Sequence, residues 1–177
     1  MCIRDRSHTA PDCPATLIAQ AVNGPTPRVA IARAGSELPM MAARDATKAK
    51  IMRPIFVGEA DAINAEAKKL SWDISTFTIH DTNGEAEAAN RAAQLCGAGE
   101  ADVLMKGHLH TDMFMKGILT RDNKLRTANR LVHVFHITPP GRDEPLLISD
   151  AAVNVTPDIK TRQACTQAVV DLSLIHI

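Results

Sequence analysis

Short apolar runs alternate with helix-like segments through most of this 177-residue chain. The runs at residues 29–32, 55–57 and 103–105 have the length of buried strands. The segments between them, as at residues 35–50 and 85–96, carry the composition and apolar spacing of helices. A repeated strand–helix–strand order is typical of a parallel sheet with right-handed crossovers. We therefore predict an α/β fold: a doubly wound, mostly parallel sheet with helices on both faces, in three layers.

The rest of the chain continues this pattern. Its elements are delimited by turn residues, such as the Pro-Pro-Gly sequence at residues 139–141. We predict further helices at residues 59–70, 112–119 and 157–171, and further strands at 73–79, 131–137 and 146–148.

The two ends do not resemble sequence selected to fold. Residues 1–5 and 172–176 can be encoded by opposite strands of one short oligonucleotide, similar to a transposon tag used in sequencing libraries. We therefore expect residues 1–6 and 172–177 to be non-native ends and exclude them from fold reasoning. Residues 7–27 contain four prolines with little periodicity, which predicts a linker or lead-in segment.

Charge and cysteine content narrow the class of protein. Lys plus Arg and Asp plus Glu number 20 each, so electrostatics give no reason to expect a nucleic-acid or membrane-surface partner. The apolar runs are far shorter than the roughly 20 residues of a spanning helix. Cys13, Cys96 and Cys165 are widely and irregularly spaced, unlike a disulfide framework or a zinc pattern. We predict a cytoplasmic protein.

Polar residues follow two of the predicted strands directly. The sequence "DVLMKGHLHTD" (102–112) and the sequence "LLISDAAVNVTPD" (146–158) each begin with an apolar run and break into polar residues. Ligands of open α/β sheets bind at the carboxyl ends of strands. Two such ends in one sheet could converge on one ligand.

Three other features of the sequence could also indicate a binding site: a pair of histidines, single glycines after strands, and a helix start. His108 and His110 have a spacing that a metal site could use, but no acidic or Cys partner completes a recognisable set, so we predict no metal. Single glycines after two strands lack the spacing of nucleotide-binding loops. Thr111 could cap a helix whose free amides bind an anion, with Lys116 about one turn further along. The alternative is a capped surface helix.

Several motifs together resemble one family. The sequences "LMKGHLHTD", "LRT", "RLVHVF" and "PLLISDAAVNVTPDIKTR", in this order, are similar to the phosphate acetyl/butyryltransferase family. They resemble most the branch of bifunctional enoyl-CoA hydratase/phosphate acetyltransferases. The likeness runs over residues 28–171, which we interpret as a partial phosphate acyltransferase domain. A hydratase part would precede residue 7.

The resemblance implies a reaction: reversible transfer of an acetyl or butyryl group between coenzyme A and orthophosphate. It implies acyl-CoA and phosphate as partners, coenzyme A as substrate with no tightly bound cofactor, and a homo-oligomeric parent protein. It also implies that this chain is an incomplete part of a two-domain, isocitrate-dehydrogenase-like fold. Two alternatives stay open: a non-catalytic CoA- or nucleotide-binding module, and a related two-domain dehydrogenase, which would need metal-binding carboxylates.

The same resemblance assigns substrate-binding residues. The family's order of a Gly, a His, a hydroxyl residue and a cation matches Gly107, His110, Thr111 and Lys116, although acetyltransferases carry Arg where Lys116 stands. The family's "D-A-A-x-N" motif matches Asp150 and Asn154. The family's main catalytic residues lie beyond residue 171, so the catalytic residues are unknown and we expect the chain alone to be inactive.

Overall fold

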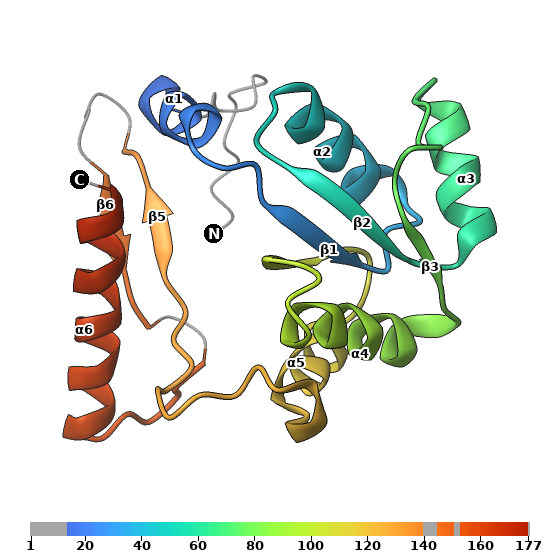
Figure 1. Cartoon of the computed structure of the whole chain (residues 1–177). Helices are drawn as coiled ribbons and strands as arrows, with labels where there is room; N and C mark the ends of the chain where they lie inside the picture. Colours follow the sequence, from blue (N-terminus) through green and yellow to red (C-terminus); the bar gives the residue numbers. More distant parts are fainter. Residues whose placement is uncertain (1–13, 140–144, 151–152, 177) are drawn as a thin grey trace, which may run out of the picture. The chain divides into compact units, whose positions relative to one another are not determined.

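The computed structural model describes residues 14–139, 145–150 and 153–176. The chain forms two compact units, Met1–Arg126 and Thr127–Ile177 (Figure 1). The sequence interpretation did not separate them.

The first unit is built on a parallel sheet. Among its described residues the strands are β1 (Arg28–Ala32), β2 (Arg53–Gly58), β3 (Ile79–Asp81) and β4 (Val103–Lys106), in the spatial order β3-β2-β1-β4. All three pairings are parallel, and Ala30 of β1 lies opposite both Ile55 and Leu104. The helices that follow these strands are α2 (Glu37–Lys48), α3 (Ala60–Lys69), α4 (Gly84–Gly97) and α5 (Thr111–Leu119).

Helices cover both faces of this sheet, as the sequence predicts. Successive residues of β1 point to opposite faces, so Ile31 joins one core with α2 and α3, and Ala30 joins another with α4. Figure 1 shows α2 and α3 on one side of the strands and α4 and α5 on the other. The parallel, three-layer α/β architecture is therefore confirmed for this unit.

The two cores differ in composition. On the α2 and α3 face, Phe56 is fully buried and meets Trp72 and Phe77 edge-on, with ring centroids 5.7 and 6.1 Å apart. Burying a side chain of this size contributes roughly 1.5–3 kcal/mol. On the other face α4 contributes mainly alanines, which allow α5 to approach closely: a Cβ added to Gly117 would lie 2.8 Å from the Ala89 carbonyl oxygen. Small residues thus set the position of α5.

An ion pair joins β1 to the edge strand β4. The Arg28 Nη2 donates to Asp102 Oδ1 at 2.7 Å, while the Arg28 Nε and backbone N–H donate to Asp102 Oδ2 at 3.0 and 2.8 Å. These bonds lower the pKa of Asp102 to about 2. The two strands are therefore fixed to each other at the end opposite the polar loops.

The second unit corrects the predicted topology. Its described strands, β5 (Phe135–Ile137) and β6 (Leu146–Ile148), pair antiparallel with each other and are not part of the parallel sheet. The connection between them is shorter than the dozen or so residues of a crossover, which leaves only the antiparallel arrangement. The strand predicted at 131–137 is also shorter than expected. A long helix, α6 (Ile159–His176), completes the unit.

Other element bounds differ from the predictions. Residues 7–27, predicted as a linker, contain the helix α1 (Ala15–Asn23), and in this fully described helix no residue is buried. The strand predicted at 73–79 begins only at Ile79, because the Asp73 carboxylate accepts a hydrogen bond from the Ser75 N–H and holds a turn. Helix α6 continues through residues 172–176, which the sequence reasoning set aside. Residues 140–141 of the predicted Pro-Pro-Gly turn lie outside the described residues.

Replacing Asp102 by Asn should destabilise the first unit at neutral pH, because Arg28 loses its charged partner. The folded-state pKa of about 2 lies below the usual Asp value of about 3.9, so the carboxylate stabilises the fold above pH 4 or so. This contribution is lost as the pH falls toward about 2. Urea unfolding, followed by the fluorescence of the single tryptophan, Trp72, should show a lower midpoint for Asp102→Asn at pH 7 and little difference near pH 2.

The matched control is Asp45→Asn, since the exposed Asp45 carboxylate is bound by its neighbour Arg44 on the same helix. An Asp102→Asn midpoint as high as that of Asp45→Asn at pH 7 would show that the Arg28 pair contributes nothing.

Candidate functional site

The loops after β1 and β4 leave the sheet in opposite directions. The two strands are neighbours, yet β1 leads into α2 on one face and β4 leads into α5 on the other. Such a switch point opens a crevice at the carboxyl edge of a parallel sheet, where ligands of this fold class bind. Residues 107–110, predicted from the sequence as a site, lie there.

Gly107 is fixed by a close approach of two backbones. Its N–H donates to the Ala32 carbonyl at 2.9 Å, and the next N–H, of His108, donates to the Arg33 carbonyl at 3.0 Å. A Cβ at this position would lie 2.5 Å from the Arg33 carbonyl oxygen and closer still to that of Ala32. The predicted Gly is thus required for the loop to rest on the end of β1.

A carboxylate network holds the other end of the loop. Glu85, in the first turn of α4, accepts hydrogen bonds from the His110 backbone N–H at 2.9 Å and from the Arg33 Nη1 at 2.9 Å. The His110 Nδ1 lies 2.8 Å from Glu85 Oε2. The His110 backbone N–H, the His110 ring and the Arg33 charge together lower the pKa of Glu85. Glu85 therefore remains a carboxylate and ties α4, β1 and the loop together.

Arg33 is shared between two carboxylates. Its Nε lies 3.6 Å from Glu59 Oε1, while its Nη1 also donates to the His108 carbonyl at 3.3 Å. Its backbone has a left-handed φ of 55°, which turns the chain away from β1. These bonds leave Arg33 as a structural cation rather than a free anion receptor.

A shallow pocket of about 250 Å³ opens beside this network. It is lined by Glu85, Lys106, Gly107, His108, Leu109 and His110. Lys106, His108 and His110 are exposed, so the rim offers a lysine and two imidazoles to a ligand. Cationic and imidazole donors of this kind can bind phosphate groups.

The start of α5 differs from the prediction. His110, not Thr111, occupies the N-cap position, and its side chain makes no cap hydrogen bond in the described structure. Thr111 is already helical, so its hydroxyl is one position too late to cap. The His110 N–H donates to Glu85. Lys116 is exposed on α5 and lies about 140° around the helix axis from Thr111. The structure brings Gly107 and His110 together in one pocket, whereas neither Thr111 nor Lys116 is among the residues that line it.

Asp150 and Asn154 bind each other in the second unit. Asp150 Oδ2 accepts hydrogen bonds from the Asn154 side-chain Nδ2 and, at 2.9 Å, from its backbone N–H, while Oδ1 accepts from the His133 N–H at 3.2 Å. The Asn154 side chain, followed by the backbone donors, lowers the pKa of Asp150. The Asn154 Nδ2 also donates to the Leu131 carbonyl at 3.2 Å. The pair holds the segment before β5 against the loop after β6.

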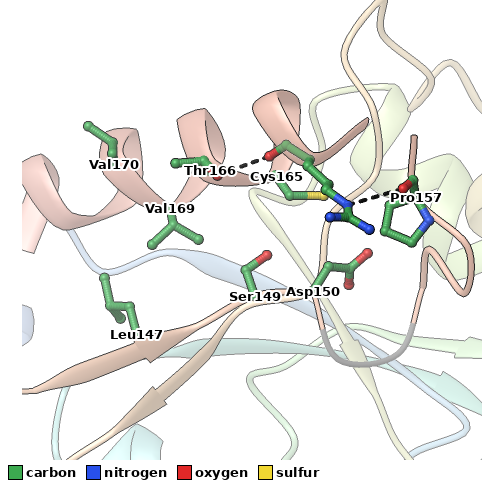
Figure 2. A pocket seen from close by; sticks show the side chains of 9 residues that line it. Leu147, Ser149, Asp150, Pro157, Cys165, Thr166, Val169 and Val170 are labelled. Atoms are coloured by element: carbon green, nitrogen blue, oxygen red, sulfur yellow. Dashed lines mark hydrogen bonds between the residues drawn. The ribbon is translucent and has the colours of Figure 1, made fainter. Parts of the chain in front are cut away.

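A second pocket, of about 490 Å³, lies between β6 and α6 (Figure 2). Ser149, Asp150 and Cys165 face into it at one end, and Leu147 and Val169 line the other. The Ser149 Oγ is buried and has no hydrogen-bond partner among the described residues. Arg162 also lines the pocket, held by its Nε to the Pro157 carbonyl at 3.2 Å. This pocket combines a cation and a hydroxyl with an apolar wall.

Sequence reasoning missed the residues that organise the first pocket. Arg33 follows β1, Glu59 precedes α3 and Glu85 begins α4, and only their placement in the sheet shows that they meet. Glu85 directly follows the Asn83-Gly84 turn at a helix start, the one local signal that could have drawn attention to it. Among the described residues, no group of three or more His, Cys, Asp or Glu side chains is placed to hold a metal ion. No described helix has the length and apolarity to cross a bilayer.

Comparison of structures first defines the class of fold. A branched-chain phosphotransacylase from Enterococcus faecalis superposes with a TM-score of 0.65 at 19% identity, over 83% of this chain and 51% of that one. The EutD phosphotransacetylase from Staphylococcus aureus gives a TM-score of 0.61 at 18% identity, over 82% and 52%. The chain therefore has the α/β fold of part of the phosphotransacylases.

The chain is also similar in sequence to curated phosphate acyltransferases. A phosphate butyryltransferase of Clostridium beijerinckii is 34% identical over 146 residues, 82% of this chain and 48% of the relative. A phosphate acetyltransferase of Rhizobium meliloti is 33% identical over 142 residues, 80% and 45%. No family model matches the chain. The chain spans about half the length of these curated relatives, and over that span its sequence is similar to phosphate acetyl- and butyryltransferases.

Replacing Gly107 by Ala should lower the free energy of unfolding of the first unit by about 1–3 kcal/mol, the usual cost of overpacking. The added methyl group would collide with backbone oxygens, which cannot move aside as a flexible side chain can. Urea unfolding monitored by Trp72 fluorescence measures the change.

Gly24→Ala provides the control, because a Cβ there would meet only ordinary contacts at 3.5 and 3.6 Å. Equal unfolding midpoints for the two variants would mean that the loop does not rest on β1 as described.

Proposed function

We propose that this chain is part of an enzyme that transfers an acetyl or butyryl group between coenzyme A and orthophosphate. The observation that carries the proposal is the identity of 34% with a phosphate butyryltransferase over 82% of the chain. The loop after β4, with its basic rim, lies within that span. In this reaction a phosphate oxygen attacks the thioester carbonyl, the C–S bond breaks, and acyl phosphate and CoA are formed.

The proposed substrate-binding residues are those matched to the family: Gly107, His110, Thr111, Lys116, Asp150 and Asn154. The geometry supports different roles within this set. Gly107 brings the loop against β1, and His110 lines the pocket beside Lys106. Asp150 and Asn154 shape the loop after β6, where the Ser149 Oγ faces the second pocket. We add Lys106 and His108 to this proposed set because they line the same pocket as His110.

The proposal also covers the location, oligomeric state, domain organisation and cofactor use of the parent protein. We propose a cytoplasmic, homo-oligomeric parent of two domains related to the isocitrate-dehydrogenase fold, belonging to the branch with an enoyl-CoA hydratase. Residues 28–171 would form its partial acyltransferase domain, residues 7–27 its lead-in segment, and residues 1–6 and 172–177 non-native ends. Coenzyme A would act as substrate, with no tightly bound cofactor and no metal.

The test is CoA release by the full-length protein that contains this chain, measured with a thiol reagent on acetyl-CoA and butyryl-CoA. We expect release only when phosphate is present, because phosphate is the acyl acceptor. Equal release without phosphate would identify a thioesterase, and CoA binding without turnover would identify a binding module. The chain alone should be inactive, because in the family the main catalytic residues lie beyond residue 171.

Removing the Lys106 charge should weaken binding of phosphate or CoA. A hydrogen bond to a charged group contributes about 1.5–3 kcal/mol, so Lys106→Ala in the full-length protein should raise the KM for one of the two substrates by about tenfold or more. Lys116→Ala, measured beside it, tests the lysine that the resemblance assigns and should act in the same direction.

The control is Lys48→Ala, an exposed lysine at the end of α2. If Lys106→Ala and Lys116→Ala both leave KM at the Lys48→Ala value, neither lysine binds substrate and both belong to solvated surface.

A further inference from the structure

We propose that the pocket between β6 and α6 binds a β-strand that the parent protein supplies after residue 171, and that this strand pairs in parallel with the free edge of β6. The inference rests on one part of the proposed function, namely that the chain belongs to a longer enzyme. The lengths of the relatives support this part, because the matched stretch covers 48% of the phosphate butyryltransferase and 45% of the phosphate acetyltransferase.

One edge of β6 has no partner strand among the described residues. β5 and β6 form a two-stranded sheet in which Leu147 lies opposite His136. In an antiparallel pair, alternate residues turn their backbone N–H and C=O groups away from the partner strand, so at least one residue of β6 presents these groups at the free edge. A sheet of two strands is marginally stable in water, and a third strand stabilises it.

The pocket adjoins β6 on the side away from β5. Its lining residues come from β6, the loop after it and α6, and none comes from β5. Its volume of about 490 Å³ is far above that of the voids in close-packed protein interiors, few of which exceed a water molecule. Leu147, Val169 and Val170 form an apolar wall, and Val170 is 44% exposed. The space between strand and helix therefore lacks a layer of apolar side chains.

The direction of α6 fits a strand–helix–strand crossover. Asp150 and Pro157 lie at one end of the pocket, and Leu147 and Val169 lie at the other (Figure 2), so α6 runs antiparallel to β6. The chain consequently leaves α6 near the amino end of β6. A parallel strand needs a connection of a dozen or more residues, usually a helix, and the segment from residue 149 to residue 171 is longer than this. Because β5 occupies one edge of β6, the next strand can join β6 only at the other.

A strand in this position would also extend the proposed substrate-binding edge. Its apolar side chains would pack on Leu147 and Val169. The carboxyl ends of parallel strands lie at one edge of a sheet, where ligands of open α/β folds bind. The added strand would therefore end beside Ser149 and Asp150, and the residues after it would join Asp150 and Asn154 in the proposed set.

The accessibility of the pocket tests the proposal without a measurement of activity. Val170→Cys in the 177-residue chain should react readily with iodoacetamide. In the full-length protein its rate should fall by about tenfold or more, because the added strand would have to open before the thiol reacts.

The matched control is Val22→Cys, since Val22 also lies on a helix and is also 44% exposed, but does not line this pocket. Peptide mapping by mass spectrometry separates the two introduced thiols from the native cysteines. A ratio of the Val170→Cys rate to the Val22→Cys rate that is the same in the chain and in the full-length protein would overturn the proposal.

Amide hydrogen exchange, followed by NMR, distinguishes a paired strand from any other cover. In the 177-residue chain, the β6 amides that point away from β5 should exchange faster than those bonded to β5. In the full-length protein both kinds should be protected alike, as expected for the amides of β2, which has a partner on each side in both proteins. An outward β6 amide that still exchanges rapidly in the full-length protein would rule out the strand, even if Val170→Cys is covered. Protection that is lost on dilution to monomers would assign the pocket to a second copy and contradict the proposal as well.

These readouts separate this inference from the proposed function. A full-length protein with a protected β6 edge but no acyl transfer to phosphate would overturn the proposed function and leave the added strand in place. An enzyme that is active on acyl-CoA and phosphate, yet leaves Val170→Cys as reactive as in the 177-residue chain, would overturn the added strand alone.

Discussion

The arrangement of the first unit depends on the contact between the loop after β4 and the end of β1. Two backbone hydrogen bonds, from Gly107 to Ala32 and from His108 to Arg33, bring the chains so close that no side chain fits at position 107. That contact places the Lys106 to His110 loop over the switch point of the sheet. It also directs α5 onto α4, where Gly117 and Ala89 allow the helices to touch. The position of the loop, and of the pocket beside it, thus depends on one close approach.

A network of ion pairs and hydrogen bonds reinforces this backbone contact. Glu85 and Glu59 face the single Arg33, and Glu85 also binds the backbone and ring of His110. Each partner comes from a different strand or helix, so the network links the carboxyl edge of the sheet to three helix starts. A site built in this way is preorganised, which is what the proposed acyl transfer would require of the groups that bind its substrates.

The sequence predicted the first unit better than the second for a physical reason. In the parallel sheet, apolar runs such as 29–32 and 55–57 are buried on both faces and alternate with amphipathic helices, so pattern alone reveals them. The apolar pattern does not show how β5 pairs, because residues 135–137 and 146–148 have the same apolar character in either a parallel or an antiparallel sheet. Only the short connection between the two strands indicates the antiparallel pairing. The short α1 was hidden by flanking prolines. Gly107 and His110 were predicted through motifs, whereas the contact between Glu85 and Arg33 required the topology that joins residues 52 positions apart.

The central claim, acyl transfer to phosphate, is tested most directly by phosphorus-31 NMR on the full-length protein supplied with butyryl-CoA and phosphate labelled with oxygen-18. The account predicts a butyryl phosphate signal that grows together with free CoA and retains all the labelled oxygens of phosphate, because a phosphate oxygen attacks the thioester carbon. Release of CoA together with free butyrate, and no acyl phosphate, would contradict it.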